Sequence, residues 1–290
     1  MPAAGHVLSR IGIAGLQLDL EKGNNLARIA QEVAAAKQRL PWVDVIVLGE
    51  LSAYGADVRH AEPLGGPAEQ EFCRLARDLG VWLVPGSLFQ KQGPDVFNVA
   101  PIIDPSGTIV ARYHKMFPFR PYEEGVTPGG SFCVFTVPGI GRFGVSICYD
   151  LWFPETTRAL AWLGAEVVIT PTLTNTIDRE TEACLARANA AMNQCYLVNV
   201  NAAGSLGFGR SIVCGPGGEV IHQSGSGREV FAVEIDLDYV ARVRERGWHG
   251  LGQQLKSFRD CTAAFPPYQP GARSAVLDAL GPVAKPKAAL

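Results

Sequence analysis

The sequence predicts an α/β fold built in layers, with two β-sheets flanked by helices rather than one wound sheet. Both halves of the 290-residue chain alternate strand-like and helix-like segments, and both also carry hairpin signals. In addition, 47% of the residues are hydrophobic and only 19% are charged, which is enough apolar side chain for a large core. The length alone permits one large domain or two small ones.

The first half of the chain contains strands, two helices and a long loop. Apolar runs predict strands at 11–20, 43–48, 81–89, 97–103 and 108–113. Helix formers predict helices at 23–40 and 67–79. The turn sequence DPSG joins the last two strands in a hairpin. The loop that follows, 115–130, holds three prolines, and a loop of this length inside a compact domain is usually functional.

The second half of the chain also alternates strands and helices. Strands are expected at 132–137, 142–148, 166–170, 195–200, 210–214, 220–223 and 230–235. Helices are expected at 155–163, 179–193 and 237–246. From Ala264 the chain is rich in proline and alanine, so we divide it into a domain, 1–263, and a tail, 264–290. The tail is either disordered or an arm that packs on a partner subunit.

Composition and short motifs exclude several classes of function. A net charge of −2 without a dense Lys/Arg block argues against nucleic acid or an anionic membrane as a partner. The apolar runs are too short to span a membrane, and MPAAGHVLSR has no apolar signal core. Seven cysteines without a CxxC pair favour a cytoplasmic protein with free thiols.

The remaining motifs do not indicate a cofactor or a metal. GIGRFG, residues 139–144, matches GxGxxG, but it precedes a strand instead of opening a helix, so we interpret it as a hairpin turn. The five histidines are scattered without the spacing of metal ligands, which also makes a Cys–His hydrolase improbable.

One segment, GVSICYDLWFPE at 144–155, organises the prediction. An apolar strand ends at Cys148, a sharp turn follows, and Pro154 stands where a helix begins. Chemistry in layered α/β proteins collects at the carboxyl ends of strands. A lone cysteine there is still more often a packing residue than a nucleophile, so further residues must decide.

Three charged residues have unusual settings. Glu50 closes an apolar strand, where a carboxylate is rare unless it is paired or functional. Lys115 follows a strand in the aromatic segment RYHKMFPF, and Glu123 lies in the same loop, in PYEEG. Taken singly, each is more simply a solvated carboxylate or a lysine whose stem packs on apolar surface. Together with Cys148 they occur in a distinct order along the chain: a Glu at the end of a strand, a Lys after a later strand, and a Cys at the end of another strand.

This order resembles the nitrilase, or carbon–nitrogen hydrolase, superfamily, in its amidase-like branch. The resemblance covers residues 11–246 and rests on GE in VIVLGELSAYG, YHK in RYHKMFPF and the CYDLWFPE block. GRS at 209–211, the turn CGPGGEV and EIDLDYV support it. It implies an αββα sandwich that usually dimerises into an αββααββα assembly, and hydrolysis of non-peptide C–N bonds without a metal or organic cofactor.

The resemblance also implies roles for individual residues. It maps the nucleophile onto Cys148, the general base and acid onto Glu50, and the oxyanion-stabilising cation onto Lys115. Glu123, whose neighbour Glu124 could be confused with it, is expected to orient the substrate or to hold Lys115. The backbone N–H of Tyr149 is expected to assist at the oxyanion. The other cysteines lack a nearby base pattern or lie in ordinary packing positions.

The expected substrate is a small aliphatic or aromatic primary amide. The run Cys148-Tyr149-Asp150 differs from the Cys-Trp-Glu run of nitrile-hydrolysing members, and Trp152 stands where ω-amidase-like members place an arginine. An N-carbamoyl amine is the second candidate and a nitrile the third. Pocket-lining residues are expected among four aromatic side chains: Tyr54, Phe117, Trp152 and Phe153. The non-enzymatic alternative is a catalytically silent binding or assembly module. The partner expected besides the substrate is a second copy, in a homodimer or higher homo-oligomer.

Overall fold

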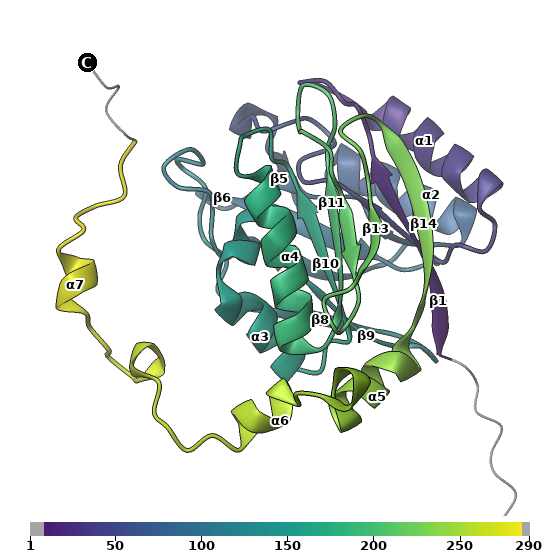
Figure 1. Ribbon diagram of the computed structural model, residues 1–290. Coiled ribbons are helices and arrows are strands. Elements are labelled where there is room, and N and C mark those ends of the chain that lie inside the picture. The colour runs from purple at the N-terminus through teal and green to yellow at the C-terminus, as the bar shows by residue number, and fades with distance from the viewer. Residues whose placement is uncertain (1–8, 286–290) are drawn as a thin grey trace, which may run out of the picture.

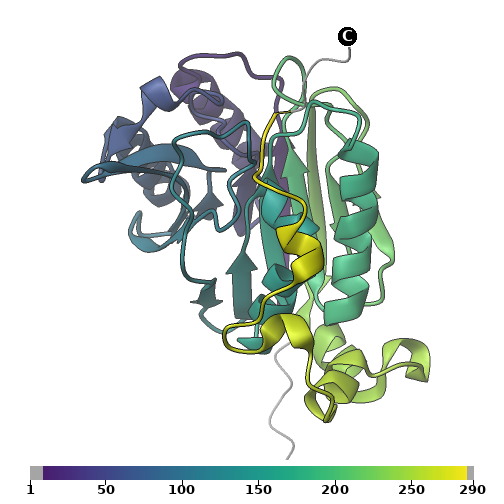
Figure 2. The same cartoon turned by 90° about the vertical axis from the view of Figure 1, so that its left-hand side faces the viewer.

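Two β-sheets pack face to face between two layers of helices in the computed structural model, which describes residues 9–285 (Figures 1 and 2). Residues 1–8, which hold most of the segment searched for a signal core, and residues 286–290 of the expected tail lie outside the described residues. The four-layer αββα arrangement predicted from the sequence is confirmed.

The first sheet has the strand order β14-β1-β2-β4-β6-β5-β3, and β7 pairs with β6. Its strands are β1 (Arg10–Gln17), β2 (Val45–Leu48), β3 (Glu62–Pro63), β4 (Trp82–Val84), β5 (Leu88–Gln92), β6 (Asp95–Ile103), β7 (Ile109–His114) and β14 (Glu229–Asp236). The second sheet has the order β13-β12-β11-β10-β9-β8. Its strands are β8 (Cys133–Val137), β9 (Gly141–Val145), β10 (Val167–Thr172), β11 (Tyr196–Asn201), β12 (Ile212–Cys214) and β13 (Val220–Gln223).

Helices cover the outer face of each sheet, as Figure 2 shows edge-on. The first sheet is covered by α1 (Leu26–Arg39) and α2 (Pro67–Leu79), and the second by α3 (Pro154–Trp162) and α4 (Arg179–Asn193). The remaining helices are α5 (Leu237–Arg246), α6 (Gln254–Arg259) and α7 (Ala275–Asp278), with short 3-10 turns η1 (Val58–His60), η2 (Cys148–Trp152), η3 (Trp248–Gly250) and η4 (Pro266–Tyr268).

Alternation along the strands explains the layers. On β2, Val45 and Val47 point into the cluster between the sheets, whereas Ile46 and Leu48 pack with the residues of α1 and α2. On β10, Val167 belongs to the cluster between the sheets and Val168 packs with Leu160 of α3. Each of these strands is apolar on both faces because both faces are covered, which is why they read as continuous apolar runs in the sequence.

The expected strand 81–89 is wrong as a single element, because it is interrupted at residues 85–87 and gives two strands, β4 and β5, which both pair antiparallel with β6. Gly86 has a φ of +83°, and a Cβ at that position would lie 1.7 Å from the carbonyl oxygen of Gly49. The interruption therefore needs glycine for its conformation and for its close approach to the end of β2. The hairpin expected around GIGRFG is confirmed, since it joins β8 to β9.

After α6 the chain leaves the body of the protein as an arm, drawn in yellow in Figure 1. All residues from 264 to 285 are exposed except Ser274, which is half-buried. The arm touches the rest of the chain where Tyr268 Oη donates to Glu155 Oε1 (3.2 Å), and the Lys285 ammonium lies 5.9 Å from the ring centroid of Tyr122.

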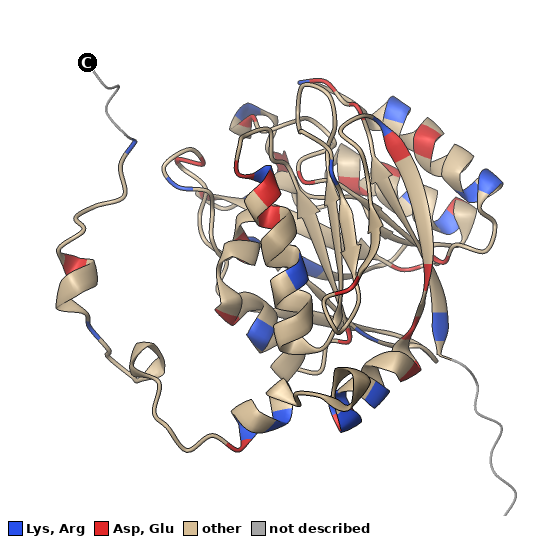
Figure 3. Ribbon diagram, viewed as in Figure 1, with Lys and Arg blue, Asp and Glu red and all other residues tan. Residues whose placement is uncertain are grey.

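Acidic and basic residues are interspersed on the visible ribbon, without a large region of one sign (Figure 3). Within residues 9–285, no helix combines the length and the apolar character that crossing a bilayer requires.

Candidate active site

The two sheets meet at the point where β2 ends. The N–H of Glu50, just after β2, donates to the carbonyl of Thr172 at the end of β10 (3.0 Å), so a backbone hydrogen bond links the first sheet to the second. Gly49 allows this approach, because a Cβ there would lie 3.0 Å from backbone atoms of both Thr172 and Ala202. The Glu50 side chain is therefore carried into the space between the sheets, where it is only 3% exposed.

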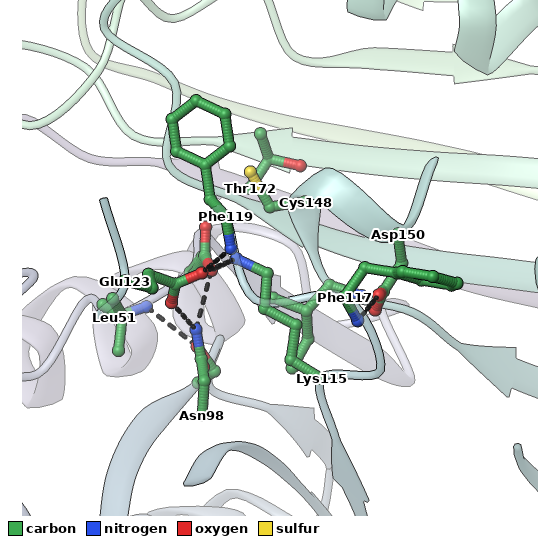
Figure 4. Close-up of polar contacts among 12 residues, drawn as sticks. Leu51, Asn98, Lys115, Phe117, Phe119, Glu123, Cys148, Asp150 and Thr172 are labelled. Atoms are coloured by element: carbon green, nitrogen blue, oxygen red, sulfur yellow. Dashed lines mark hydrogen bonds and ion pairs between the residues drawn. The ribbon is translucent and has the colours of Figure 1, made fainter. Parts of the chain in front are cut away.

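Glu50 belongs to a buried cluster of charged and amide side chains whose other members, Asn98, Lys115 and Glu123, are labelled in Figure 4. The Lys115 ammonium, 1% exposed, donates to Glu50 Oε1 (2.8 Å) and to Glu123 Oε2 (2.7 Å). Asn98, on β6, donates from its amide nitrogen to the same oxygen of Glu50, Oε1 (2.8 Å), and to the other oxygen of Glu123, Oε1 (3.0 Å). Two carboxylates thus share one cation and one amide.

The cluster shifts the pKa of each of its members. Burial raises the pKa of Glu50, and the charge of Glu123 adds to the rise although Lys115 opposes it. Burial would also raise the pKa of Glu123, but the charge of Lys115 and several hydrogen bonds outweigh it and lower that pKa. Burial would lower the pKa of Lys115, yet the surrounding anions raise it, so this lysine stays protonated.

Cys148 stands at the turn between β9 and η2. Its φ is +46°, a conformation that only a few non-glycine residues adopt and that is concentrated at functional sites. Asp150 fixes this turn, because its carboxylate accepts from the N–H of Ile147 (2.9 Å), the hydroxyl of Tyr113 (2.7 Å) and the N–H of Phe117 (2.8 Å). Burial raises the pKa of Asp150 to about 6. One buried carboxylate thereby ties the cysteine turn to the loop that carries Lys115.

The Cys148 thiol is 8% exposed and lies among oxygen atoms. Its Sγ is 3.7 Å from Thr174 Oγ1 and 3.9 Å from Glu182 Oε1, and Glu50 is near enough for its charge to act on the thiol. Burial raises the pKa of this thiol well above its usual range, and the negative charges of Glu50 and Glu182 add to the rise. The thiol is therefore protonated at neutral pH, and it needs a proton acceptor to become a nucleophile.

A cavity of about 970 Å³ opens onto Cys148. Its deep end is formed by buried residues, Cys148, Thr174 and Glu182, and its mouth includes the exposed basic side chains of Lys22, Arg59 and His60. Aromatic residues line the walls: Tyr54, Phe119, Tyr122, Tyr149 and Trp152. The volume is at the upper end of the range for small-molecule sites. Within residues 9–285, no three His, Cys, Asp or Glu side chains are grouped so that they could hold a metal ion.

A family model described as carbon–nitrogen hydrolase matches residues 10–245. The chain belongs to the carbon–nitrogen hydrolase family. Omega-amidase NIT2 of Xenopus tropicalis is 28% identical over 256 residues, which cover 82% of this chain and 92% of that protein. Deaminated glutathione amidase of Homo sapiens is 31% identical over 208 residues, 63% of this chain and 62% of that protein.

Solved structures of this family match as well. Nit3 of Saccharomyces cerevisiae, a member of branch 10 of the nitrilase superfamily, has a TM-score of 0.76 at 26% identity, covering 84% of this chain and 96% of that one. The amidase of Nesterenkonia sp. AN1, in a cysteine-to-alanine variant in complex with butyramide, has a TM-score of 0.70 at 26% identity, covering 81% of this chain and 94% of that one. The family assignment made from GE, YHK and CYDLWFPE is confirmed.

The structure brings most of the predicted site residues of this carbon–nitrogen hydrolase together. Glu50 and Glu123 both accept hydrogen bonds from Lys115, and the charge of Glu50 acts on the Cys148 thiol. Glu123 rather than its neighbour Glu124 contacts Lys115, because Glu124 points to solvent. Tyr149 follows Cys148 directly in η2, and its ring lines the cavity.

Of the four aromatic residues expected in the pocket, Tyr54 and Trp152 line the cavity. Phe117 and Phe153 do not line it, which corrects their expected placement. Their rings instead stack on each other, with centroids 3.7 Å apart and planes 10° from parallel. This stack packs the Lys115 loop against the residue that precedes α3, so its role in the structure is to hold the two segments together. Phe119 and Tyr122 of the same loop, which we did not predict, occupy the cavity wall.

Sequence reasoning also missed Asn98, Thr174 and Glu182. Asn98 stands in the apolar strand DVFNVAPII, so the same signal that singled out Glu50, a polar group in a buried strand, could have found it. Glu182 is in the first turn of α4 and looks like an ordinary solvated helix residue in the sequence. It is buried because Arg179, one turn earlier, pairs with it at 3.0 Å.

The other six cysteines do not line the cavity. Three of them are buried in the layers of the fold, at Cys133, Cys195 and Cys214, and burial raises the pKa of each. Cys73 is half-buried, whereas Cys184 and Cys261 are exposed. Only Cys148 combines access to the cavity with a charged cluster.

Proposed function

We propose that this carbon–nitrogen hydrolase is an amidase that converts a small primary amide to a carboxylate and ammonia through a thioester on Cys148. The observation that carries the proposal is the buried Glu50–Lys115–Glu123 cluster, whose charges act on Cys148, the one cysteine among the described residues that lines the cavity. Burying three charged groups is costly, so their combination beside a thiol favours a catalytic role.

In the first step, the Cys148 thiol gives its proton to Glu50 as the sulfur attacks the amide carbon. The raised pKa of Glu50 suits this role, because a base works best when its pKa lies near the working pH. A carbon–sulfur bond forms and the carbonyl electrons move onto oxygen, giving a tetrahedral oxyanion. The Lys115 ammonium and the backbone N–H of Tyr149 stabilise that negative charge.

In the second step, the tetrahedral intermediate collapses. The carbon–nitrogen bond breaks, Glu50 returns its proton to the departing nitrogen, and ammonia leaves a thioester on Cys148. Glu50, ionised again, then takes a proton from water as the water oxygen attacks the thioester carbon. The carbon–sulfur bond breaks, the carboxylic acid leaves, and the thiolate recovers its proton from Glu50.

Glu123 keeps Lys115 in place during both steps. Its pKa is lowered, so it stays ionised while Glu50 gains and loses a proton. The lysine therefore always has one permanent anionic partner, and its ammonium is held at the same point. The other oxygen of Glu123, Oε1, accepts from Asn98 (3.0 Å), and we propose that this carboxylate also orients the amide nitrogen of the substrate.

The substrate class is supported by the relatives and by the cavity. Omega-amidase NIT2 and the Nesterenkonia amidase, which was captured with butyramide, both act on or bind amides according to their names. The cavity walls are aromatic and suit an acyl group of modest size. N-carbamoyl amines are the second candidate, because the deep end of the cavity offers an acceptor, Glu182, for an additional N–H. Nitriles remain the third.

The test is ammonia release from aliphatic amides, aromatic amides, ω-amides, N-carbamoyl amines and nitriles. We expect ammonia from amides with the native protein and a loss of at least about 10³-fold with Cys148→Ala. Cys195→Ala, which removes a buried thiol outside the cavity, is the matched control and should retain turnover. Turnover only with carbamoyl amines or nitriles would change the substrate but not the site. No ammonia from any compound would favour the binding-module alternative, and full turnover by Cys148→Ala would refute the nucleophile.

A further inference from the structure

Beside the nucleophile lies a second buried ion pair that the reaction steps above do not use. Arg179 and Glu182, one turn apart on α4, are each 2% exposed and are joined from Arg179 Nη1 to Glu182 Oε2 at 3.0 Å. Figure 3 shows acidic residues at this end of α4. A buried pair of this kind adds little stability compared with apolar residues of similar size, so its presence at a cavity invites a functional explanation.

Four of the five N–H donors of Arg179 are hydrogen-bonded, including the one on Nη1 that donates to Glu182. Its Nε donates to the carbonyl of Gly209 (3.0 Å), and its Nη2 donates to Asn199 Oδ1 (2.6 Å) and to the carbonyl of Arg210 (2.8 Å). The guanidinium is thus held by β11 and by the segment before β12, and Arg179 itself does not line the cavity. Its effect on the cavity is to fix the orientation of the Glu182 carboxylate.

The other oxygen of that carboxylate, Oε1, faces the cavity without a close partner. Its contacts are Trp152 Nε1 at 3.4 Å and Cys148 Sγ at 3.9 Å, both longer than a normal hydrogen bond to a carboxylate. A carboxylate oxygen only accepts hydrogen bonds. The cavity therefore presents a fixed, buried acceptor that is poorly satisfied and lies next to the sulfur that attacks the substrate.

The charge around Cys148 points to the same kind of ligand. Glu50, Glu123 and Glu182 are three carboxylates near the thiol, against two buried cations, Lys115 and Arg179. When all five are ionised, the deep end carries an excess of negative charge. A free carboxylate on the substrate would be repelled there, whereas an ammonium or another N–H would be attracted.

We propose that Glu182 is a specificity-determining residue whose Oε1 accepts a hydrogen bond from an N–H on the acyl side of the scissile carbonyl. The inference rests on the proposed amidase function, because the thioester route places the acyl group on Cys148, next to this oxygen. The preferred substrates then carry an amino group or a ureido N–H within one or two atoms of the carbonyl carbon. The shared chemistry is an N–H donor, which an α-amino amide or an N-carbamoyl amine can supply.

The test compares substrate pairs of equal size that differ in this donor: glycinamide against propionamide, and ethylurea against butyramide. Binding is measured by calorimetry to the full-length Cys148→Ala protein, so that differences in chemical reactivity do not enter. We expect glycinamide to bind about 10- to 100-fold more tightly than propionamide, as for a charge-assisted hydrogen bond, and ethylurea to bind several-fold more tightly than butyramide. Raising the pH through about 8, where an α-amino group loses its proton, should reduce only the glycinamide preference.

In the Cys148→Ala background, Glu182→Gln keeps the size of the side chain but removes its charge, and it should reduce the glycinamide preference to less than about 3-fold. Glu180→Gln, an exposed carboxylate on the same turn of α4 and outside the cavity, is the matched control and should leave the preference unchanged. Because Glu182→Gln leaves Arg179 without its anionic partner, a second variant that replaces the pair with Arg179→Met and Glu182→Leu gives the same measurement without a buried unpaired charge.

The outcomes separate this inference from the proposed function. Equal binding of both members of each pair, while the native protein releases ammonia from amides, would overturn the role of Glu182 and leave the amidase standing. A donor preference that disappears with Glu182→Gln, in a protein that hydrolyses none of the compounds, would support the binding site and refute the amidase. A preference that survives both Glu182 variants would also overturn the inference.

Discussion

Asn98 offers the sharpest test of how the charged cluster sets the acidity of Glu50. Its amide nitrogen donates to Glu50 Oε1 and to Glu123 Oε1, and its side chain is completely buried. Asn98→Leu has the same number and branching of side-chain heavy atoms but no donor, so it removes these two hydrogen bonds while keeping the shape of the side chain. The perturbation acts on the carboxylates and leaves Cys148 and Lys115 as they are.

The expected magnitude follows from the bonds that are lost. A hydrogen bond to a charged group contributes about 1.5 to 3 kcal/mol. Since 1.36 kcal/mol corresponds to one pH unit, losing the donor to ionised Glu50 should raise its pKa by about 1 to 2 pH units. Glu50 must be ionised to accept the thiol proton, so activity falls as the pH drops through this pKa. In Asn98→Leu the acid limb of the profile should therefore move to higher pH, while the rate at alkaline pH stays within about 10-fold.

The measurement is kcat/KM for a neutral amide between about pH 4.5 and 9, which reports groups of the free enzyme. Asn193→Leu is the matched control, because Asn193 is also buried and donates only to the carbonyl of Asn189 within α4 (2.9 Å). It should lower stability without moving the acid limb. An unchanged acid limb in a folded Asn98→Leu protein would show that the cluster does not control the titration, and the assignment of Glu50 as the base would fail with it.

Two further predictions concern the cysteine turn and the tail. Tyr113→Phe removes the hydroxyl that donates to Asp150 at 2.7 Å and should destabilise the protein by about 2 kcal/mol, lowering Tm by roughly 4 °C. Because burial raises the pKa of Asp150 to about 6, the contribution of Asp150 to the free energy of unfolding should fall as the pH rises from about 4 through 6. The loss of stability caused by Tyr113→Phe should therefore be larger at pH 7.5 than at pH 5. Equal losses of Tm at the two pH values in thermal melts would contradict this. Removing residues 264–290 should reduce the oligomeric mass measured by light scattering, because the exposed apolar side chains of the arm, Val276, Leu277, Leu280 and Val283, are expected to pack on a second copy; an unchanged mass would argue against an inter-subunit arm.

The helices and strands were predictable where a single sequence pattern determines their bounds. Apolar alternation and Gly or Pro boundaries place α2, α4, α5 and β13 at the bounds observed. The strand expected at 81–89 failed because the deciding contact, Gly86 against the carbonyl of Gly49, joins segments that are far apart in the sequence. The hydrophobicity of a single segment does not reveal such a contact. Val84 and Leu88, on either side of the interruption, are both buried, so the apolar pattern continues across it.

The candidate site was predictable to a similar extent. Glu50, Lys115 and Cys148 stand out because each interrupts an apolar or aromatic neighbourhood at the end of a strand. Glu182 gives no such signal, because its burial depends on carbonyls of Gly209 and Arg210, on another loop, that hold Arg179. Phe117 and Phe153 show the same limit, since the sequence identifies aromatic side chains but not whether they face a cavity or each other.

The electrostatics of the site favour a thiol that loses its proton during attack on the substrate over a thiol that is already ionised in the free protein. Reactive cysteines commonly have a lowered pKa because a cation or a helix N-terminus faces the sulfur. Here burial and two carboxylates raise the pKa of Cys148, and Lys115, whose charge opposes that rise, is already shared between Glu50 and Glu123. In the mechanism that we propose, the sulfur therefore becomes nucleophilic only as its proton moves to Glu50 during attack. The negative charge would then pass from Glu50 through sulfur to the carbonyl oxygen, so that Lys115 would remain close to an anion throughout and the cluster would never hold an unpaired buried lysine.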